Sequence, residues 1–491
     1  MERAAGILLS ISSLPSPHGI GTLGRAACDF VDFLAGAGQT YWQLLPVGPL
    51  SYGDSPYQSF STFAGNPYFI DLDLLEEDGL LTRGEIDAHF WGDDPRRVDY
   101  GAIYRGRFVL LEKAFDRGWA RDAEALAAFT AENRDWLLDY ALFMALKRHF
   151  DMRSWTEWPE DIRLRRPDAM ARWRGELERD VNFFIYLQFL FQRQWDTLKA
   201  YAGGKGVQLI GDLPIYVALD SADVWAGPEN YLLDGDNVPT AVAGVPPDGF
   251  TPDGQLWGNP IYDWKKMEED GFFWWRRRMS AALGRFDVVR IDHFRGLESY
   301  WSVPYGAETA APGHWEKGPG LAFVEMLHSA FPDSLLIAED LGYITPEVRA
   351  LVDASGYPGM KVLEFAFDDR EAGDYLPHKY PENCICYVGT HDNNTVLGWF
   401  SEVVPESAAT AKHYLGLNRE EGIHWGMIRG GLSSRARLFV AQMQDCLGLG
   451  GWARMNTPGS SSGNWQWRML PGEASPALEE KLRDLTALFG R

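Results

Sequence analysis

The chain has 491 residues, of which 46% are hydrophobic, so it is long enough to bury a large core. It carries 46 Lys and Arg against 69 Asp and Glu, a formal net charge of −23. This acidic balance disfavours nucleic acid and anionic membranes as partners, and it leaves neutral ligands unaffected. The N-terminal apolar run is too short for a signal peptide, and no stretch reaches the roughly 20 apolar residues that span a bilayer. With only four Cys, the composition predicts a cytoplasmic protein without a disulfide framework.

Short apolar runs that are typical of buried strands recur along the chain, and helical patterns follow several of them. Strands that alternate with helices predict a parallel sheet covered on both faces. Eight such units predict one closed (β/α)8 barrel over residues 1–491, in the α/β class. The expected strands cover residues 6–10, 41–48, 207–217, 286–294, 335–340, 360–367, 384–392 and 452–456.

Two connections are far longer than an ordinary loop of such a barrel. The first contains helical stretches such as DWLLDYALFMALKRHF, and the second is rich in Gly, Pro and Asp, as in PPDGFTPDGQLWGNP. Because structureless loops of this length are uncommon, we predict two insertion subdomains. One is mostly helical and covers residues 51–200 after the second strand, and the other covers residues 215–285 after the third.

Polar residues stand where several of the predicted strands end. In a parallel barrel the active site lies at the C-terminal ends of the strands, so we expect these side chains to meet there. They are Asp212 on the third strand, Arg290 and Asp292 on the fourth, Glu339 on the fifth, and His391 and Asp392 on the seventh.

Several carboxylates in an acidic chain suit either a metal site or glycoside chemistry. Arg290 precedes Asp292 by two residues and therefore shares its face of the strand. A cation there favours an ionised carboxylate and disfavours a second cation. No phosphate-binding G-x-G-x-x-G or G-K-[ST] loop is present. The 67 aromatic residues fit either a large core or rings that stack on sugars. We therefore favour glycoside chemistry and expect no metal and no other cofactor.

Three segments, GRFDVVRIDHFRGL, LLIAEDLG and YVGTHDNNT, resemble the second, third and fourth signature regions of the α-amylase clan. The third strand continues as GDLPIYVALDSADVW and lacks the His that ordinary α-amylases carry there. Together with SYGDSPYQSFSTFAGNPYFI and GQLWGNPIYDW, this departure resembles the 4-α-glucanotransferases of glycoside hydrolase family 77, the amylomaltase type. The resemblance extends over essentially the whole chain.

The resemblance implies a retaining enzyme in which Asp292 is the nucleophile, Glu339 the general acid/base, and Asp392 holds hydroxyl groups of the donor sugar. Such an enzyme would move a segment of an α-1,4-glucan to another glucan or to glucose, through a covalent glycosyl intermediate on Asp292. Its partners would be maltooligosaccharides and glucans derived from starch or glycogen. A hydrolase of the α-amylase type, with the same machinery and water as acceptor, is the alternative.

Glu339 must be protonated for the first step, so we expect burial or a neighbouring carboxylate to raise its pKa. Asp340 follows it on the strand and should point to the opposite face, which leaves Asp392 as the expected neighbour. His293 follows Asp292, so its ring should turn away from the barrel mouth, and its role stays open. A further set of residues is expected to contact glucan, namely Tyr52, Tyr57, Asp212, Asp248, Phe250, Trp257, Arg290, His391 and Asn464.

Overall fold

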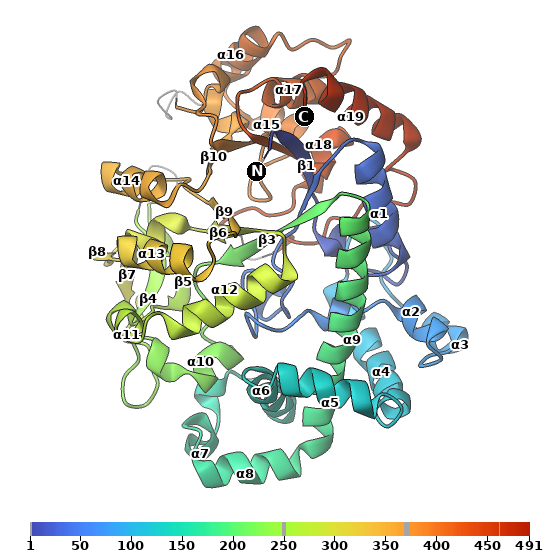
Figure 1. Ribbon diagram of the computed structural model, residues 1–491, viewed down its shortest axis with the longest axis vertical. Coiled ribbons are helices and arrows are strands. Elements are labelled where there is room, and N and C mark those ends of the chain that lie inside the picture. The colour runs from blue at the N-terminus through green and yellow to red at the C-terminus, as the bar shows by residue number, and fades with distance from the viewer. Residues whose placement is uncertain (1, 248–251, 368–373, 461) are drawn as a thin grey trace.

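An eight-stranded parallel sheet forms the centre of the computed structural model, which describes residues 2–247, 252–367, 374–460 and 462–491 (Figure 1). Its strands pair in the order β10-β11-β12-β1-β2-β3-β6-β9. The amide of Ala338 donates to the carbonyl of Pro358 at 3.0 Å and joins the two ends of this series, so the fold is the expected (β/α)8 barrel. The strands are β1 (Ala4–Leu8), β2 (Tyr41–Gln43), β3 (Gln208–Pro214), β6 (Val288–Asp292), β9 (Leu335–Ala338), β10 (Gly359–Val362), β11 (Cys384–Tyr387) and β12 (Leu438–Gln442).

The barrel strands are near-continuous apolar runs because both of their faces are covered. Every residue of β1, β11 and β12 is buried. Seven of the strands overlap the predicted ranges, but the eighth prediction, at 452–456, is wrong. Gly451–Ala453 is a short 3-10 helix, and β12 pairs instead with β1 and β11. The run LFVAQ supplies the consecutive apolar side chains that a doubly covered strand needs, whereas Arg454 and Asn456 are polar and hydrogen-bond other segments.

Helices surround the barrel, and their ends follow ordinary capping chemistry. Thr345 accepts a hydrogen bond from the amide of Val348 at the start of α14, and Gly356 ends that helix with φ +67°, a conformation that glycine adopts readily. Ser475 caps α19 in the same way. The helices that alternate with the strands in this layer include α1 (Arg25–Gly36), α9 (Glu178–Gly204), α12 (Phe273–Arg285), α13 (Gly320–Ala330), α14 (Pro346–Ser355), α15 (Val396–Glu402), α16 (Pro405–Leu415), α17 (Ile423–Leu432), α18 (Met443–Cys446) and α19 (Pro476–Leu488).

Helices dominate the chain between β2 and β3, in the lower part of Figure 1. Long helix α9 leads from this region back to the barrel, where it contacts α1 and β3. We keep the division into a barrel and two insertions, 51–200 and 215–285, as a proposal. The other helices of this stretch are α2 (Leu72–Glu77), α3 (Arg83–Asp87), α4 (Tyr100–Gly118), α5 (Ala123–Glu132), α6 (Leu137–His149), α7 (Glu160–Arg163) and α8 (Pro167–Glu176).

A second, antiparallel sheet lies beside the barrel, with the strand order β5-β4-β7-β8. Strands β4 (Ala241–Val245) and β5 (Gln255–Pro260) come from the chain between β3 and β6, together with helices α10 (Ala222–Ala226) and α11 (Trp264–Glu269). Strands β7 (Ser299–Pro304) and β8 (His314–Lys317) follow β6 and are not expected from the sequence. This sheet therefore joins two segments that flank the strand carrying Asp292.

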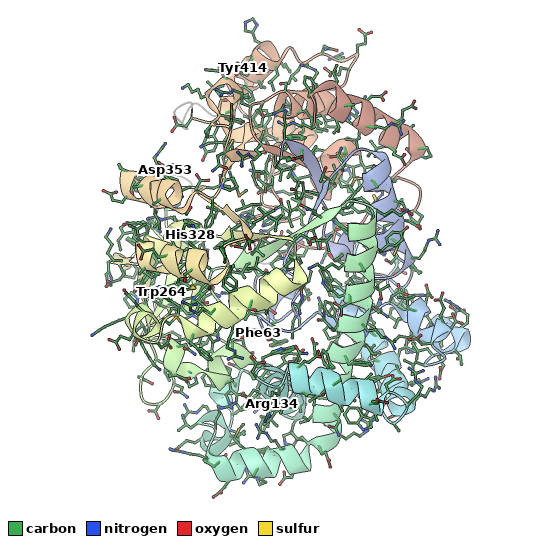
Figure 2. All side chains as sticks on the ribbon, viewed as in Figure 1. Phe63, Arg134, Trp264, His328, Asp353 and Tyr414 are labelled. Atoms are coloured by element: carbon green, nitrogen blue, oxygen red, sulfur yellow. The ribbon has the colours of Figure 1, made fainter. Side chains whose placement is uncertain are left out.

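Aromatic side chains fill much of the interior. Eleven of the 20 Trp are buried, so the aromatic excess largely belongs to the core. Phe63, labelled in Figure 2, stacks on Trp136 with ring centroids 6.2 Å apart. Within the described part of the chain, no helix is both long and apolar enough to cross a bilayer.

Candidate active site

The register of the barrel sheet brings the predicted strand-end residues together. Ile291 pairs with Ala338, so Asp292 and Glu339 follow at the same level on the adjacent strands β6 and β9. Asp212 of β3 pairs with Arg290 of β6 on the other side. Because all these strands are parallel, their C-terminal ends form one edge of the barrel, where barrel enzymes place their active sites.

Arg290 connects two carboxylates at this edge. Its Nη1 lies 2.6 Å from Asp212 Oδ1 and 2.9 Å from Asp292 Oδ1. The hydroxyl of Tyr57 donates to the other oxygen of Asp212 at 2.6 Å. Arg290 and Asp212 are buried, whereas the side chain of Asp292 is 27% exposed. Of the two carboxylates that Arg290 contacts, Asp292 is therefore the one that a ligand can reach.

Backbone amides hold both oxygens of the Glu339 carboxyl group. The amide of His293 donates to Oε2 and the amide of Leu341 to Oε1, each at 2.7 Å. Burial nevertheless raises the pKa of Glu339 to about 8, and the nearby charge of Asp292 adds to this increase. Arg290 and the two amides act in the opposite direction. Glu339 is thus largely protonated at neutral pH and can donate a proton.

The carboxylate next to Glu339 differs from the expected one. Asp292, and not Asp392, is the carboxylate that raises the pKa of Glu339, because the sheet register sets the two residues side by side. Asp340 does point away, as expected, since its Oδ1 accepts from the amide of Met360 at 2.6 Å. The neighbouring carboxyl groups of Asp292 and Glu339 therefore come from adjacent strands of the barrel.

Burial also raises the pKa of Asp292, to about 6. Arg290 and His391 oppose this increase, whereas Asp212 and Asp392 add to it. The expected effect of Arg290 on the carboxylate is present, but desolvation outweighs it. Asp292 is ionised at neutral pH, as a nucleophile must be.

Asp392 follows β11 and is held by residues 452–456, where the predicted eighth strand is absent. Asn456 Nδ2 donates to Asp392 Oδ1 at 2.6 Å, and Arg454 donates to the carbonyl of Asp392 at 2.6 Å. His391 Nε2 lies 3.4 Å from the same carboxylate oxygen. The His391 ring stacks on Tyr57, with centroids 5.1 Å apart. Asn456 and Arg454 are functional candidates that we missed, and their polarity within the run WARMN was the available signal.

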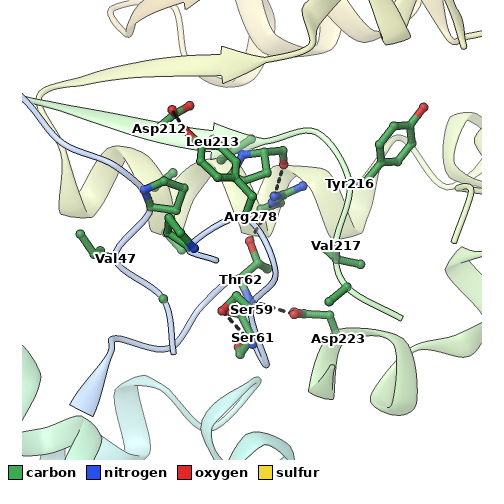
Figure 3. A pocket seen from close by; sticks show the side chains of 18 of the residues that line it. Val47, Ser59, Ser61, Thr62, Asp212, Leu213, Tyr216, Val217, Asp223 and Arg278 are labelled. Carbon is green, nitrogen blue, oxygen red and sulfur yellow. Dashed lines mark hydrogen bonds between the residues drawn. The ribbon is translucent and has the colours of Figure 1, made fainter. Parts of the chain in front are cut away.

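A small cavity of about 70 Å³ lies next to Asp212 (Figure 3). Asp212 lines it at one end and Asp223 at the other, with Arg278 and Thr62 between them. Arg278 donates to Thr62 Oγ1 and to the carbonyl of Ile215, each at 2.8 Å. Asp223 accepts from the amide of Thr62 at 2.8 Å. These contacts fix the segment that carries Tyr57 against the end of β3, and sequence patterns gave no indication of them.

The other residues predicted to contact glucan lie in different surroundings. Trp257 on β5 is half-buried, and its ring meets His293 edge to face at 4.9 Å. Tyr52 lies in the short 3-10 helix Tyr52–Asp54 and is 83% exposed. The side chain of Asn464 accepts from the amide of Thr457 and donates to the carbonyl of Ser460. Both hydrogen bonds are local and hold the loop that contains Asn464. Asp248 and Phe250 lie outside the described residues.

Among the residues that the structure describes, no group of three or more His, Cys, Asp or Glu could hold a metal ion. The donor set at the barrel edge consists of carboxylates paired with an arginine, a tyrosine and backbone amides. A barrel that presents one ionised and one protonated carboxyl group side by side is typical of enzymes that cleave or transfer glycosidic bonds.

Comparisons with known proteins agree with this class. A family model described as 4-alpha-glucanotransferase, of glycoside hydrolase family 77, matches residues 9–473. The 4-alpha-glucanotransferases of Thermus thermophilus and Clostridium butyricum are 49% and 47% identical to the chain, over 98% of its length and 98% and 100% of theirs. An amylomaltase from Streptococcus agalactiae, solved in complex with acarbose, superposes with a TM-score of 0.98 at 40% identity, with full coverage of both chains. The chain belongs to the 4-alpha-glucanotransferase family, and it is an enzyme of the transferase class.

Proposed function

We propose that this enzyme cleaves an α-1,4 bond of a maltooligosaccharide or of a starch- or glycogen-derived glucan, and passes the glucosyl segment to another glucan or to glucose. The observation that carries the proposal is the pair formed by Asp292 and Glu339 on adjacent strands, one exposed enough to attack and one protonated. Family membership supports the substrate class.

In the proposed first step, a carboxylate oxygen of Asp292 attacks the anomeric carbon of the donor sugar. The glycosidic C–O bond breaks, and Glu339 gives its proton to the departing oxygen. In the second step, the hydroxyl of the acceptor sugar loses its proton to Glu339 and attacks the same carbon. The bond to Asp292 then breaks and the carboxylate is regenerated, so the anomeric configuration is retained.

We propose that the other residues at the barrel edge bind and orient the donor sugar. Asp392 and His391 offer a carboxylate and an imidazole for sugar hydroxyl groups, and Asn456 holds Asp392 in place. Arg290 contacts the carboxylate of Asp292 directly. Asp212 pairs with Arg290, and Tyr57 donates to Asp212, so both act on Asp292 through Arg290. For Tyr52, Asp248, Phe250, Trp257 and Asn464 a contact with glucan remains part of the proposal.

An α-amylase-type hydrolase would use the same two carboxyl groups, with water as the acceptor at about 55 M. A transferase must bind the acceptor sugar well and exclude or misplace water. The sequence identity of 49% to a 4-alpha-glucanotransferase favours transfer. We further propose a cytoplasmic location, which the four free cysteines support. We also propose that no cofactor takes part, so a chelator should leave the rate unchanged.

Incubation with maltotriose tests the proposal directly. Transfer releases glucose and forms longer oligosaccharides at a constant number of reducing ends, whereas hydrolysis adds one reducing end for each bond cleaved. Asp292→Asn should abolish both reactions because no intermediate forms. Asp353→Asn, an exposed carboxylate on α14 that is labelled in Figure 2, is the matched control and should behave as the parent enzyme. A rise in reducing ends equal to the glucose released would refute transfer.

A further inference from the structure

His293 adopts an unusual backbone conformation immediately after Asp292. Strand β6 ends at Asp292 and the 3-10 helix Phe294–Leu297 begins one residue after His293, which has φ 52° and ψ 47°. This left-handed region is disfavoured for most residues other than glycine, although Asn, Asp and His adopt it more often than other side chains do. Such a conformation persists only where the surrounding structure imposes it, and it is concentrated at functional sites.

The two amides that flank this conformation both point at Glu339. The amide of His293 donates to Glu339 Oε2 at 2.7 Å, and the amide of Phe294 donates to the Glu339 carbonyl at 3.1 Å. The amide of Glu339 in turn donates to the carbonyl of Ile291 at 3.1 Å. Residues 291–294 therefore hydrogen-bond both the backbone and the side chain of Glu339. The left-handed turn lies between the two amides that donate these bonds.

The side chain of His293 is fixed by packing. Its ring meets Trp257 edge to face, with centroids 4.9 Å apart and planes at 80°. A Cβ atom at Gly296 would lie only 3.1 Å from His293 Cδ2, so the helix that follows has a glycine where the ring needs space. Burial, with a contribution from the charge of Arg295, lowers the pKa of His293 to about 3. The ring is therefore neutral at neutral pH.

We propose that His293 is a positioning residue for Glu339. Its left-handed turn directs the His293 amide at the Glu339 carboxyl group and the Phe294 amide at the Glu339 backbone carbonyl. The inference deepens the proposed function, because it rests on Glu339 as the acid/base.

The amide of His293 favours the charged form of Glu339, so it lowers the pKa of this group. Asp292 and Arg290 also face Glu339, and they raise and lower its pKa respectively. If the turn relaxes and the amide moves away, the pKa of Glu339 should increase. The alkaline limb of the pH profile should then move to higher pH while the rate falls.

Four substitutions of His293 distinguish an effect of its backbone conformation from an effect of its imidazole ring. His293→Asn and His293→Gly accept the left-handed turn, whereas His293→Ala and His293→Val resist it. We expect kcat for the Asn and Gly variants to stay within about threefold of the parent, and kcat for the Val variant to fall roughly tenfold with its alkaline limb shifted upward. Ala and Gly differ by one carbon atom, so this pair remains informative if the Val variant fails to fold. Thermal unfolding of each variant, with pH profiles on maltotriose, completes the measurement.

Equal rates and equal alkaline limbs across Gly, Ala and Val would overturn the inference, because the backbone conformation would then be irrelevant. Equal losses in all four variants would overturn it as well, since the ring alone would be responsible. Glu339→Gln separates this failure from failure of the proposed function. An active Glu339→Gln enzyme would refute the acid/base role, whereas an inactive one with unaffected His293 variants would refute only the positioning role.

Discussion

Asp292 and Glu339 stand one residue beyond the paired residues Ile291 and Ala338, so the carboxyl groups belong to adjacent strands at the same level of the barrel. The charge of Asp292 raises the pKa of Glu339, and burial raises the pKa of both groups. One geometric fact, the register of two parallel strands, thus couples the proposed nucleophile to the proposed acid. The consequences can be measured.

The plot of the reaction rate against pH should be bell-shaped. Below about pH 6 Asp292 is protonated and cannot attack, and above about pH 8 Glu339 is ionised and cannot donate a proton. We expect kcat/KM to reach its maximum near neutral pH. The apparent pKa values of the acid and alkaline limbs describe the two interacting carboxyl groups together. Initial rates on maltotriose from pH 4 to 10, checked for reversible loss at the extremes, measure it. A rate that keeps rising to pH 10 would contradict the assignment of Glu339.

Arg290→Met should affect both stability and the acid limb. Without the guanidinium, Asp212 is left buried and unpaired, which typically costs about 3–5 kcal/mol of unfolding free energy. The pKa of Asp292 should rise because Arg290 lowers it, so the acid limb moves to higher pH. Urea unfolding and a pH profile provide the two readings. Arg349→Met, which breaks an exposed pair with Asp374, is the control and should cost less than about 1 kcal/mol.

Tyr57 has two separable roles. Tyr57→Phe removes the hydroxyl group that donates to Asp212 at 2.6 Å and keeps the ring that stacks on His391. Hydrogen bonds to charged groups contribute about 1.5–3 kcal/mol, so we expect kcat/KM to fall roughly tenfold or more with an unchanged ratio of transfer to hydrolysis. Tyr57→Ala also removes the ring and should lower that ratio. Counting glucose against new reducing ends distinguishes the variants, and identical ratios in both would argue against a role for the ring.

Asn456 should matter for substrate binding more than for folding. Its amide holds Asp392, whose side chain is about half exposed, so Asn456→Ala frees the carboxylate without burying a charge. We expect KM to rise about tenfold and the midpoint of urea unfolding to stay near that of the parent. Asn383→Ala serves as the control, because it removes an exposed side-chain amide that donates to the carbonyl of Gly356. An unaltered KM would show that Asp392 does not depend on this contact.

Local patterns in the sequence predict much of this protein. Seven barrel strands and the caps of α14 and α19 follow from apolar runs and capping residues, which are properties of short segments. The candidate carboxyl groups follow too, because parallel strands bring their C-terminal ends to one edge whatever the length of the chain between them. The family resemblance then assigned roles to Asp292, Glu339 and Asp392.

Only the tertiary structure decided the rest. The eighth strand lies at Leu438–Gln442, whereas the predicted strand at 452–456 supplies Asn456 to Asp392 across 64 residues of chain. Asp292 rather than Asp392 raises the pKa of Glu339, and the left-handed turn at His293 points two amides at Glu339. Hydrogen bonds between distant segments, desolvation and backbone strain depend on how the whole barrel packs. Periodicity in a single stretch of sequence therefore carries no information about them.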